Sequence, residues 1–156
     1  MHNMMEPEKN PKIYVAASVA PEYRSVVNEL VRRLREKGWD VYAPLEHTVE
    51  NAWDWPNDEW GLQVFRMDVD AINACDVVVV LSWGRRGTTA GTSWEHGYAY
   101  GVDKRILFVE MNNSEQSLMC ANGRYATVRG IDEAVDYPFR DMWNGSSVFR
   151  TKTPQT

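Results

Sequence analysis

Cysteine, histidine and long apolar runs are scarce in this sequence, and each shortage excludes a class of protein. The two cysteines, Cys75 and Cys120, lie far apart, so no disulfide framework is expected. His47 and His96 have no second ligand at the spacing of a metal site, so both are interpreted as structural or exposed and no metal is expected. No apolar run approaches the length that crosses a membrane, so no membrane partner is expected.

Basic stripes, repeats and low-complexity tracts are missing as well. The net charge is −5 and the Lys and Arg residues are scattered, so nucleic acid is not an expected partner. A chain of 156 residues predicts one domain, which we place at residues 12–143. Residues 1–11 lack an apolar signal core and are interpreted as a disordered leader, residues 144–156 as a C-terminal tail, and the expected location is cytoplasmic.

The most informative stretch that is present runs from Cys75 to Gly101. An unbroken apolar run, Val77 to Leu81, precedes a loop rich in Gly and Thr and then a short helical pattern that carries Glu95. This order predicts a buried strand that leads into a helix through a polar loop. Ligands of open α/β sheets bind at the carboxyl ends of the strands, so this loop is the first candidate site.

Strands and helices alternate along the chain. Strands are predicted at Lys12–Ala17, Trp39–Ala43, Val77–Leu81, Arg105–Glu110 and Ala126–Arg129. Helices are predicted at Pro21–Lys37 (ended by Gly38), Trp60–Ala74, from Thr92 onward, Glu115–Ala121 and Ile131–Arg140. The stretch Glu46–Asn57 is predicted to be a long loop, and Trp53, Trp55 and Trp60 fit a core, a self-association surface or a lid equally well. The alternation predicts an α/β fold with a five-stranded parallel sheet and helices on both faces.

Glu95 is the leading catalytic candidate, and it also has a purely structural interpretation. Thr92 and Glu95 are spaced as a capping box, in which both side chains bond free backbone N–H groups at a helix start. Alternatively, a carboxylate in the first turn of this helix would lie in the crevice beside a positive helix end, stay ionised and act as a nucleophile.

Three other residues are weaker candidates. Asp68 and Asp70 lie two apart on one helix, so they cannot share a face, and a lone helical Asp is usually a solvated surface group. Ser18 follows the first strand and fits either a cap for the helix that begins at Pro21 or a phosphate ligand.

Two segments together resemble the nucleoside 2-deoxyribosyltransferase family. One is Asp68 through Ile72, Cys75 and Asp76, and the other is Gly91-Thr92-x-Trp94-Glu95-x-Gly97-Tyr98-Ala99. The opening Lys12-Ile13-Tyr14-Val15-Ala16 is similar to the family's first strand, and the resemblance extends to about Asp141. It implies a flavodoxin-like (Rossmann-like) strand order in a single domain.

The resemblance also implies roles for particular residues. Glu95 matches the glutamate that attacks the anomeric carbon of the sugar, Tyr14 the tyrosine that holds this glutamate, and Asp68 the aspartate that assists protonation of the leaving base. Such a reaction passes through an oxocarbenium-like transition state, which a fixed carboxylate stabilises. Gly91 and Met119 match further substrate-binding positions, and no cofactor is implied.

The sequence departs from the transferases at positions near the sugar 5′ group. Thr89 stands where transferases have an aspartate six residues before the nucleophile, and Ser117 stands where they have an asparagine from a neighbouring subunit. With Ser18, these hydroxyls resemble the family's nucleoside 5′-monophosphate N-glycosidases, which bind a phosphate there, whereas a carboxylate would repel it. Arg24, Arg85 and Arg86 are candidate cations, but Ala20 replaces an arginine of those hydrolases.

The sequence is therefore consistent with three functions. The first is cleavage of the N-glycosidic bond of a (deoxy)nucleoside 5′-monophosphate through a covalent glycosyl–Glu95 intermediate, with release of the free base. The second is 2-deoxyribosyl transfer between bases on free nucleosides. The third, of another class, is a nucleotide-binding module without catalysis. The resemblance implies a homodimer or larger homo-oligomer with shared active sites, because Ser117 would act in a partner's site.

Overall fold

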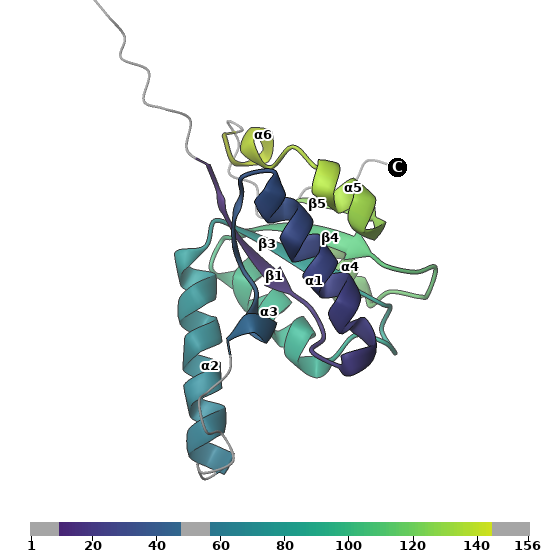
Figure 1. Cartoon of the computed structure of the whole chain (residues 1–156). Coiled ribbons are helices and arrows are strands. Elements are labelled where there is room, and N and C mark those ends of the chain that lie inside the picture. The colour runs from purple at the N-terminus through teal and green to yellow at the C-terminus, as the bar shows by residue number, and fades with distance from the viewer. Residues whose placement is uncertain (1–9, 48–56, 145–156) are drawn as a thin grey trace, which may run out of the picture.

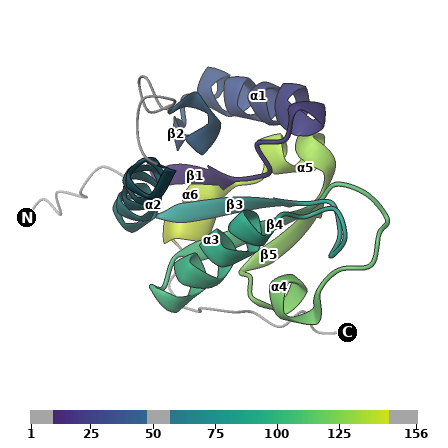
Figure 2. The same cartoon turned by 90° about the horizontal axis from the view of Figure 1, so that it is seen from below.

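The sheet has five parallel strands, and a layer of helices covers each of its faces (Figures 1 and 2). The computed structural model describes residues 10–47 and 57–144. The strand order is β2-β1-β3-β4-β5, the order of doubly wound flavodoxin-like folds, whose ligands bind where the order reverses between β1 and β3. The predicted fold class is confirmed.

The elements have the following bounds. The strands are β1 (Lys12–Ala16), β2 (Asp40–Tyr42), β3 (Val77–Ser82), β4 (Arg105–Glu110) and β5 (Ala126–Arg129). The helices are α1 (Pro21–Glu36), the 3-10 turn η1 (Pro44–Glu46), α2 (Asn57–Ala74), α3 (Ala90–Gly101), α4 (Leu118–Asn122), α5 (Gly130–Asp136) and α6 (Phe139–Asn144).

The side chains of β1 point alternately to the two faces of the sheet, and the core residues form one cluster on each face. Ile13 and Val15 pack with residues of α1, α5 and α6, whereas Tyr14 and Ala16 pack with residues of α2 and α3. Successive side chains of a strand point to opposite faces, so one strand serves both layers. Because Tyr14 faces the α2–α3 layer, its hydroxyl can meet side chains of these two helices.

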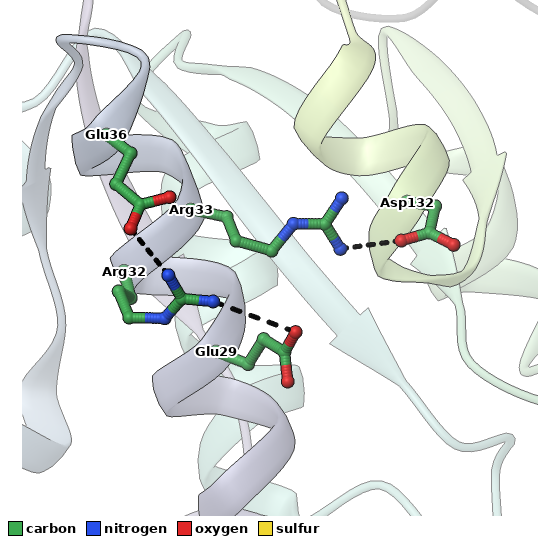
Figure 3. A network of polar contacts seen from close by, with 5 residues as sticks. All are labelled: Glu29, Arg32, Arg33, Glu36 and Asp132. Carbon is green, nitrogen blue, oxygen red and sulfur yellow. Dashed lines mark hydrogen bonds and ion pairs between the residues drawn. The ribbon is translucent and has the colours of Figure 1, made fainter.

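The opposite layer carries ion pairs on its outer surface (Figure 3). Arg33 of α1 lies 2.6 Å from Asp132 of α5, while Arg32 pairs within α1 with Glu36 at 2.5 Å and Glu29 at 3.9 Å. Exposed pairs of this kind add little to stability, because water and salt screen them. The packing of α1 on the sheet therefore depends on its apolar face rather than on these contacts.

Several predicted boundaries are wrong, and Pro138 explains the largest error. The single helix predicted at Ile131–Arg140 is two helices, α5 and α6, because Pro138 disfavours the helical conformation of the residue before it. Tyr137 accordingly is extended, with φ −66° and ψ 136°. In addition, α2 begins at Asn57 rather than Trp60, and α4 begins at Leu118 rather than Glu115.

The predicted loop at 46–57 falls largely outside the described residues. Trp53 and Trp55 lie in that part, so their three interpretations stay predictions. Trp60 lies in the first part of α2, and its side chain is 40% exposed. It is therefore not part of the core formed by the described residues. Gly38 has φ +92° just after α1, which confirms the predicted glycine stop.

Candidate active site

Tyr14 and Glu95 meet between β1 and α3. The Tyr14 hydroxyl donates a hydrogen bond of 2.7 Å to Glu95 Oε2, although the two residues are 81 positions apart. Tyr14 is fully buried, so its ring and the direction of its O–H bond are held by the surrounding core. The bond leaves Oε1 as the carboxylate oxygen that Tyr14 does not engage.

The start of α3 is not where the capping box would place it. Thr89, not Thr92, caps the helix: its hydroxyl accepts from the Thr92 N–H at 3.2 Å, and the helix begins at Ala90. Glu95 thus lies in the second turn, where backbone N–H groups already bond within the helix. Both predictions for Glu95's place, the capping box and the first turn, are wrong, and its carboxylate instead bonds to Tyr14.

Burial is the main influence on the Glu95 carboxyl. Burial raises the pKa of Glu95 to about 7, the Tyr14 hydrogen bond acts in the opposite direction, and the charge of Asp68 raises it further. The expectation that a helix end keeps Glu95 ionised is therefore wrong, because burial dominates. Near neutral pH the free protein holds Glu95 in both protonation states.

Asp68 belongs to the same electrostatic group. It lies on α2 and is half-buried, whereas Asp70 is exposed, as expected for two residues that do not share a face. Burial raises the pKa of Asp68, and the nearby His47 lowers it. The charges of Glu95 and Asp68 in turn add to the effect of burial in raising the pKa of Tyr14. A carboxyl with a raised pKa can keep a proton to donate, so Asp68 and Glu95 can act as an acid and a base.

A stack of three rings borders this group, and sequence reasoning missed two of its members. Tyr42 stacks on Tyr14 with ring centroids 5.5 Å apart, and His47 stacks on Tyr42 with ring centroids 4.3 Å apart. The available signal was the pairing of two parallel strands, which puts Tyr42 directly beside Tyr14. His47 is exposed and His96 is buried, so the two histidines lie in different surroundings.

The predicted substrate-binding residues lie in three places. Ser18 is buried after β1 and accepts from the Ala20 N–H at 3.2 Å, while Ala20 is the N-cap of α1, so the predicted helix cap at Ser18 is wrong. Thr89 and Gly91 are exposed at the start of α3. Ser117 borders a small cavity on another side of α3, and Met119 is 84% exposed on α4.

The cations near these residues are partly engaged. Arg24 donates to the Val19 carbonyl at 3.3 Å, directly after Ser18, and Arg85 pairs with Glu115 at 3.4 Å. Arg86 is exposed. In residues 10–47 and 57–144 no three His, Cys, Asp or Glu side chains are grouped to hold a metal ion. No helix in the described part of the chain is long and apolar enough to cross a membrane.

The match to a family model decides the family. Residues 13–133, more than half of the chain, match the model for nucleoside 2-deoxyribosyltransferase. The chain belongs to the nucleoside 2-deoxyribosyltransferase family. None of the curated proteins matches its sequence.

One of three similar solved structures supports this assignment. A 2-deoxyribosyltransferase from Bacillus psychrosaccharolyticus is 25% identical, with a TM-score of 0.74, over 82% of this chain and 93% of that one. A CMP N-glycosidase from Clostridium botulinum is 20% identical, with a TM-score of 0.57, over 80% and 94%. A conserved protein from Enterococcus faecalis V583 is 16% identical, with a TM-score of 0.69, over 82% and 96%. The last two show the shared fold alone.

In this member of the nucleoside 2-deoxyribosyltransferase family, burial raises the pKa of Glu95, and the hydrogen bond from Tyr14 lowers it. Tyr14→Phe removes a hydrogen bond to the charged form, so we expect the pKa of Glu95 to rise above about 7. The acidic limb of a pH–rate profile that depends on ionised Glu95 then moves to higher pH, and the variant loses more activity at pH 6 than at pH 9.

Tyr98→Phe is a matched control for Tyr14→Phe. It removes a hydroxyl from the helix that carries Glu95, but this hydroxyl donates to Asn73 at 2.9 Å. We expect its pH–rate profile to match that of the unaltered protein. An acidic limb that stays in place in Tyr14→Phe would contradict a direct effect of Tyr14 on the ionisation of Glu95.

Proposed function

We propose that this protein cleaves the N-glycosidic bond of a (deoxy)nucleoside 5′-monophosphate and releases the free base. The observation that carries the proposal is the 2.7 Å hydrogen bond from Tyr14 to a half-buried Glu95 whose pKa the charge of Asp68 helps to raise. Family membership supports chemistry at the bond between sugar and base. The choice of a monophosphate rests on the side chains expected near the 5′ group.

The reaction has two steps. Ionised Glu95 attacks the anomeric carbon through Oε1 while the carbon–nitrogen bond breaks, and protonated Asp68 delivers its proton to the departing base nitrogen. Water then attacks the glycosyl–Glu95 ester, which regenerates the Glu95 carboxylate, and the proton from this water returns to Asp68. Tyr14 holds the carboxylate in place through both steps, and the raised pKa of Asp68 favours the protonated acid that the first step needs.

The residues proposed for the 5′ group favour a phosphate. Ser18, Thr89 and a neighbouring copy's Ser117 are all neutral hydroxyl residues. A carboxylate about 4 Å from a phosphate charge would cost roughly 1 to 4 kcal/mol per unit charge, depending on the surroundings. Arg24, which lies over the loop after Ser18, adds positive charge on this side.

The proposal includes a second copy of the chain at each active site. Leu118 and Met119 are 81% and 84% exposed at the start of α4, next to Ser117. Two large apolar side chains this exposed fit a surface that a partner covers. A homodimer or larger homo-oligomer with shared sites is therefore part of the proposed function.

Matched substrates test the proposal. Base release is measured by chromatography for pairs of nucleoside and 5′-monophosphate, each with and without a free acceptor base. We expect release from monophosphates only, at a rate that the acceptor does not change. Release from free nucleosides that requires an acceptor would overturn the proposal.

The second candidate is a 2-deoxyribosyltransferase on free nucleosides, with Thr89 tolerated at the aspartate position. The 2-deoxyribosyltransferase from B. psychrosaccharolyticus favours it, since its identity and TM-score exceed those of the CMP N-glycosidase. The same assay identifies this function by acceptor-dependent exchange. A non-catalytic binding module would instead show a melting shift with nucleotide and no base release.

A further inference from the structure

Ser82, at the end of β3, joins two segments that lie far apart in the sequence. Its hydroxyl, 3% exposed, donates to Gln116 Oε1 at 2.5 Å, accepts from the Gly84 N–H at 3.2 Å and lies 3.1 Å from the Thr88 hydroxyl. The loop that leads to α3 and the segment that leads to Ser117 therefore share one buried group.

Gly84 shows how closely the two segments pack. A Cβ at this position would lie 2.5 Å from Ser114 Cβ and 3.0 Å from the Glu115 carbonyl oxygen, and Gly84 has φ +85°. The Arg85 N–H also donates to the Glu115 carbonyl at 2.9 Å. The segment before Ser117 is thus held directly against the loop after β3.

The side-chain amide of Gln116 forms a hydrogen bond through its oxygen. The 2.5 Å contact with Ser82 has the length of an O–H···O bond and is shorter than N–H···O bonds usually are, so the amide oxygen faces Ser82. The amide nitrogen Nε2 is buried, and no described residue accepts its hydrogens. It is a donor that needs an acceptor.

His96 presents the complementary atom. Its Nε2 lies 2.6 Å from the Gly123 carbonyl oxygen, which can only accept, so Nε2 carries the hydrogen. Burial lowers the pKa of His96, although the bond to Gly123 opposes this, so the ring is neutral at pH 7 and Nδ1 is an acceptor. Nδ1 is buried, and no described residue donates to it.

Both residues border one small cavity. Its volume is about 20 Å³, and Ser117 and Ser82 also line it. A water molecule needs roughly 10 to 15 Å³ of such space, so the cavity suits one. His96 borders both this cavity and a pocket of about 510 Å³ that Gly123 also lines, and its Nε2 atom is already engaged by the Gly123 carbonyl, so Nδ1 is the ring nitrogen that still needs a partner.

We propose that one buried water molecule occupies this cavity, accepts a hydrogen from Gln116 Nε2 and donates one to His96 Nδ1. The water links α3, which carries Glu95, to the segment that carries Ser117. His96 and Gln116 are then positioning residues for Ser117, and this role, unlike the water itself, rests on the proposed function.

A high-resolution crystal structure and NMR of the full chain test the water without any substrate. We expect density for one water within roughly 2.7 to 3.2 Å of both His96 Nδ1 and Gln116 Nε2. Nitrogen NMR should show a neutral His96 with its hydrogen on Nε2. A dry cavity, or a hydrogen on Nδ1, overturns the proposal.

Gln116→Met tests the positioning role, because it keeps the length of the side chain and removes the amide. We expect KM for the monophosphate to rise about 10-fold with kcat changed less than about 2-fold, since Ser117 would bind substrate rather than react with it. Gln63→Met, on an exposed part of α2, is the matched control and should leave both constants unchanged. An unchanged KM in Gln116→Met overturns the positioning role.

The two proposals fail in different ways. If the unaltered protein releases no base from any monophosphate, the proposed function fails, while the density and the His96 hydrogen still decide the water. If base is released and the cavity is dry, only the inference fails.

Discussion

Replacing Glu95 with Gln should abolish base release and make the folded protein more stable. The amide cannot form the glycosyl ester, so we expect kcat to fall by roughly 10,000-fold or more. Gln keeps an oxygen that can accept the Tyr14 hydrogen, so the local geometry should survive. Retained cleavage in this variant would exclude Glu95 as the nucleophile.

The stability gain follows from the raised pKa of Glu95, about 7 in the folded chain against an ordinary value of 4.5. Glu95 loses its proton more readily in the unfolded chain than in the folded one. Its contribution to the stability of the folded protein is therefore smallest at high pH. Its contribution falls as the pH rises from about 4.5 to about 7 and is constant above that. At pH 8 the ionised Glu95 lowers the free energy of unfolding by about 3 kcal/mol. Glu95→Gln removes this penalty, so its melting temperature should be roughly 6 to 12 °C higher.

Thermal melting at two pH values checks this expectation. Glu95→Gln should melt well above the unaltered protein at pH 8 and close to it at pH 4.5, where Glu95 is protonated in the folded chain. Asp70→Asn, an exposed carboxylate on α2, is the control and should show no comparable pH-dependent gain. A gain of equal size at both pH values would mean that the charge of Glu95 is not its cause.

Replacing Thr89 with Asp should reverse the proposed preference for a 5′ phosphate. The carboxylate would face a substrate dianion, so we expect kcat/KM for the monophosphate to fall about 100-fold or more, while kcat/KM for the matching nucleoside is kept or rises. Asp is also a good N-cap, and Thr89 caps α3 through its side-chain oxygen, so the helix should start at the same place.

Thr89→Asn is the matched control for charge. Asn caps helices as well as Asp and has nearly the same shape, but it is neutral. We expect it to keep most of the monophosphate activity. If Thr89→Asn and Thr89→Asp lose monophosphate activity equally, the effect is steric and the hydroxyl at Thr89 does not select the phosphate by charge.

The sheet and the membership of the family were predictable from local patterns. Val77 to Leu81 is an unbroken apolar run, which is typical of a strand buried on both faces, and the alternation with helices predicts parallel pairing. The motif around Glu95, together with Tyr14 and Asp68, carried the family resemblance that the match over residues 13–133 confirms.

Helix ends were predicted less well, because several side chains compete for the same role. Thr89 and Thr92 are both suitable caps by residue type, and only the path of the loop after β3 makes Thr89 the one that accepts the Thr92 N–H. Likewise, the pattern from Ile131 to Arg140 is helical throughout, but Pro138 divides it.

The sequence by itself determined the order of the elements, the two faces of the sheet and the residues that carry the family's motif, since these depend on local periodicity and residue type. Only the tertiary structure decided the state of the candidate site. The 2.7 Å bond between Tyr14 and Glu95, the pKa of about 7 and the stack of Tyr14, Tyr42 and His47 all depend on residues far apart in the chain. Burial, which sets the ionisation of Glu95, is a property of the packed layers and has no counterpart in a short stretch of sequence.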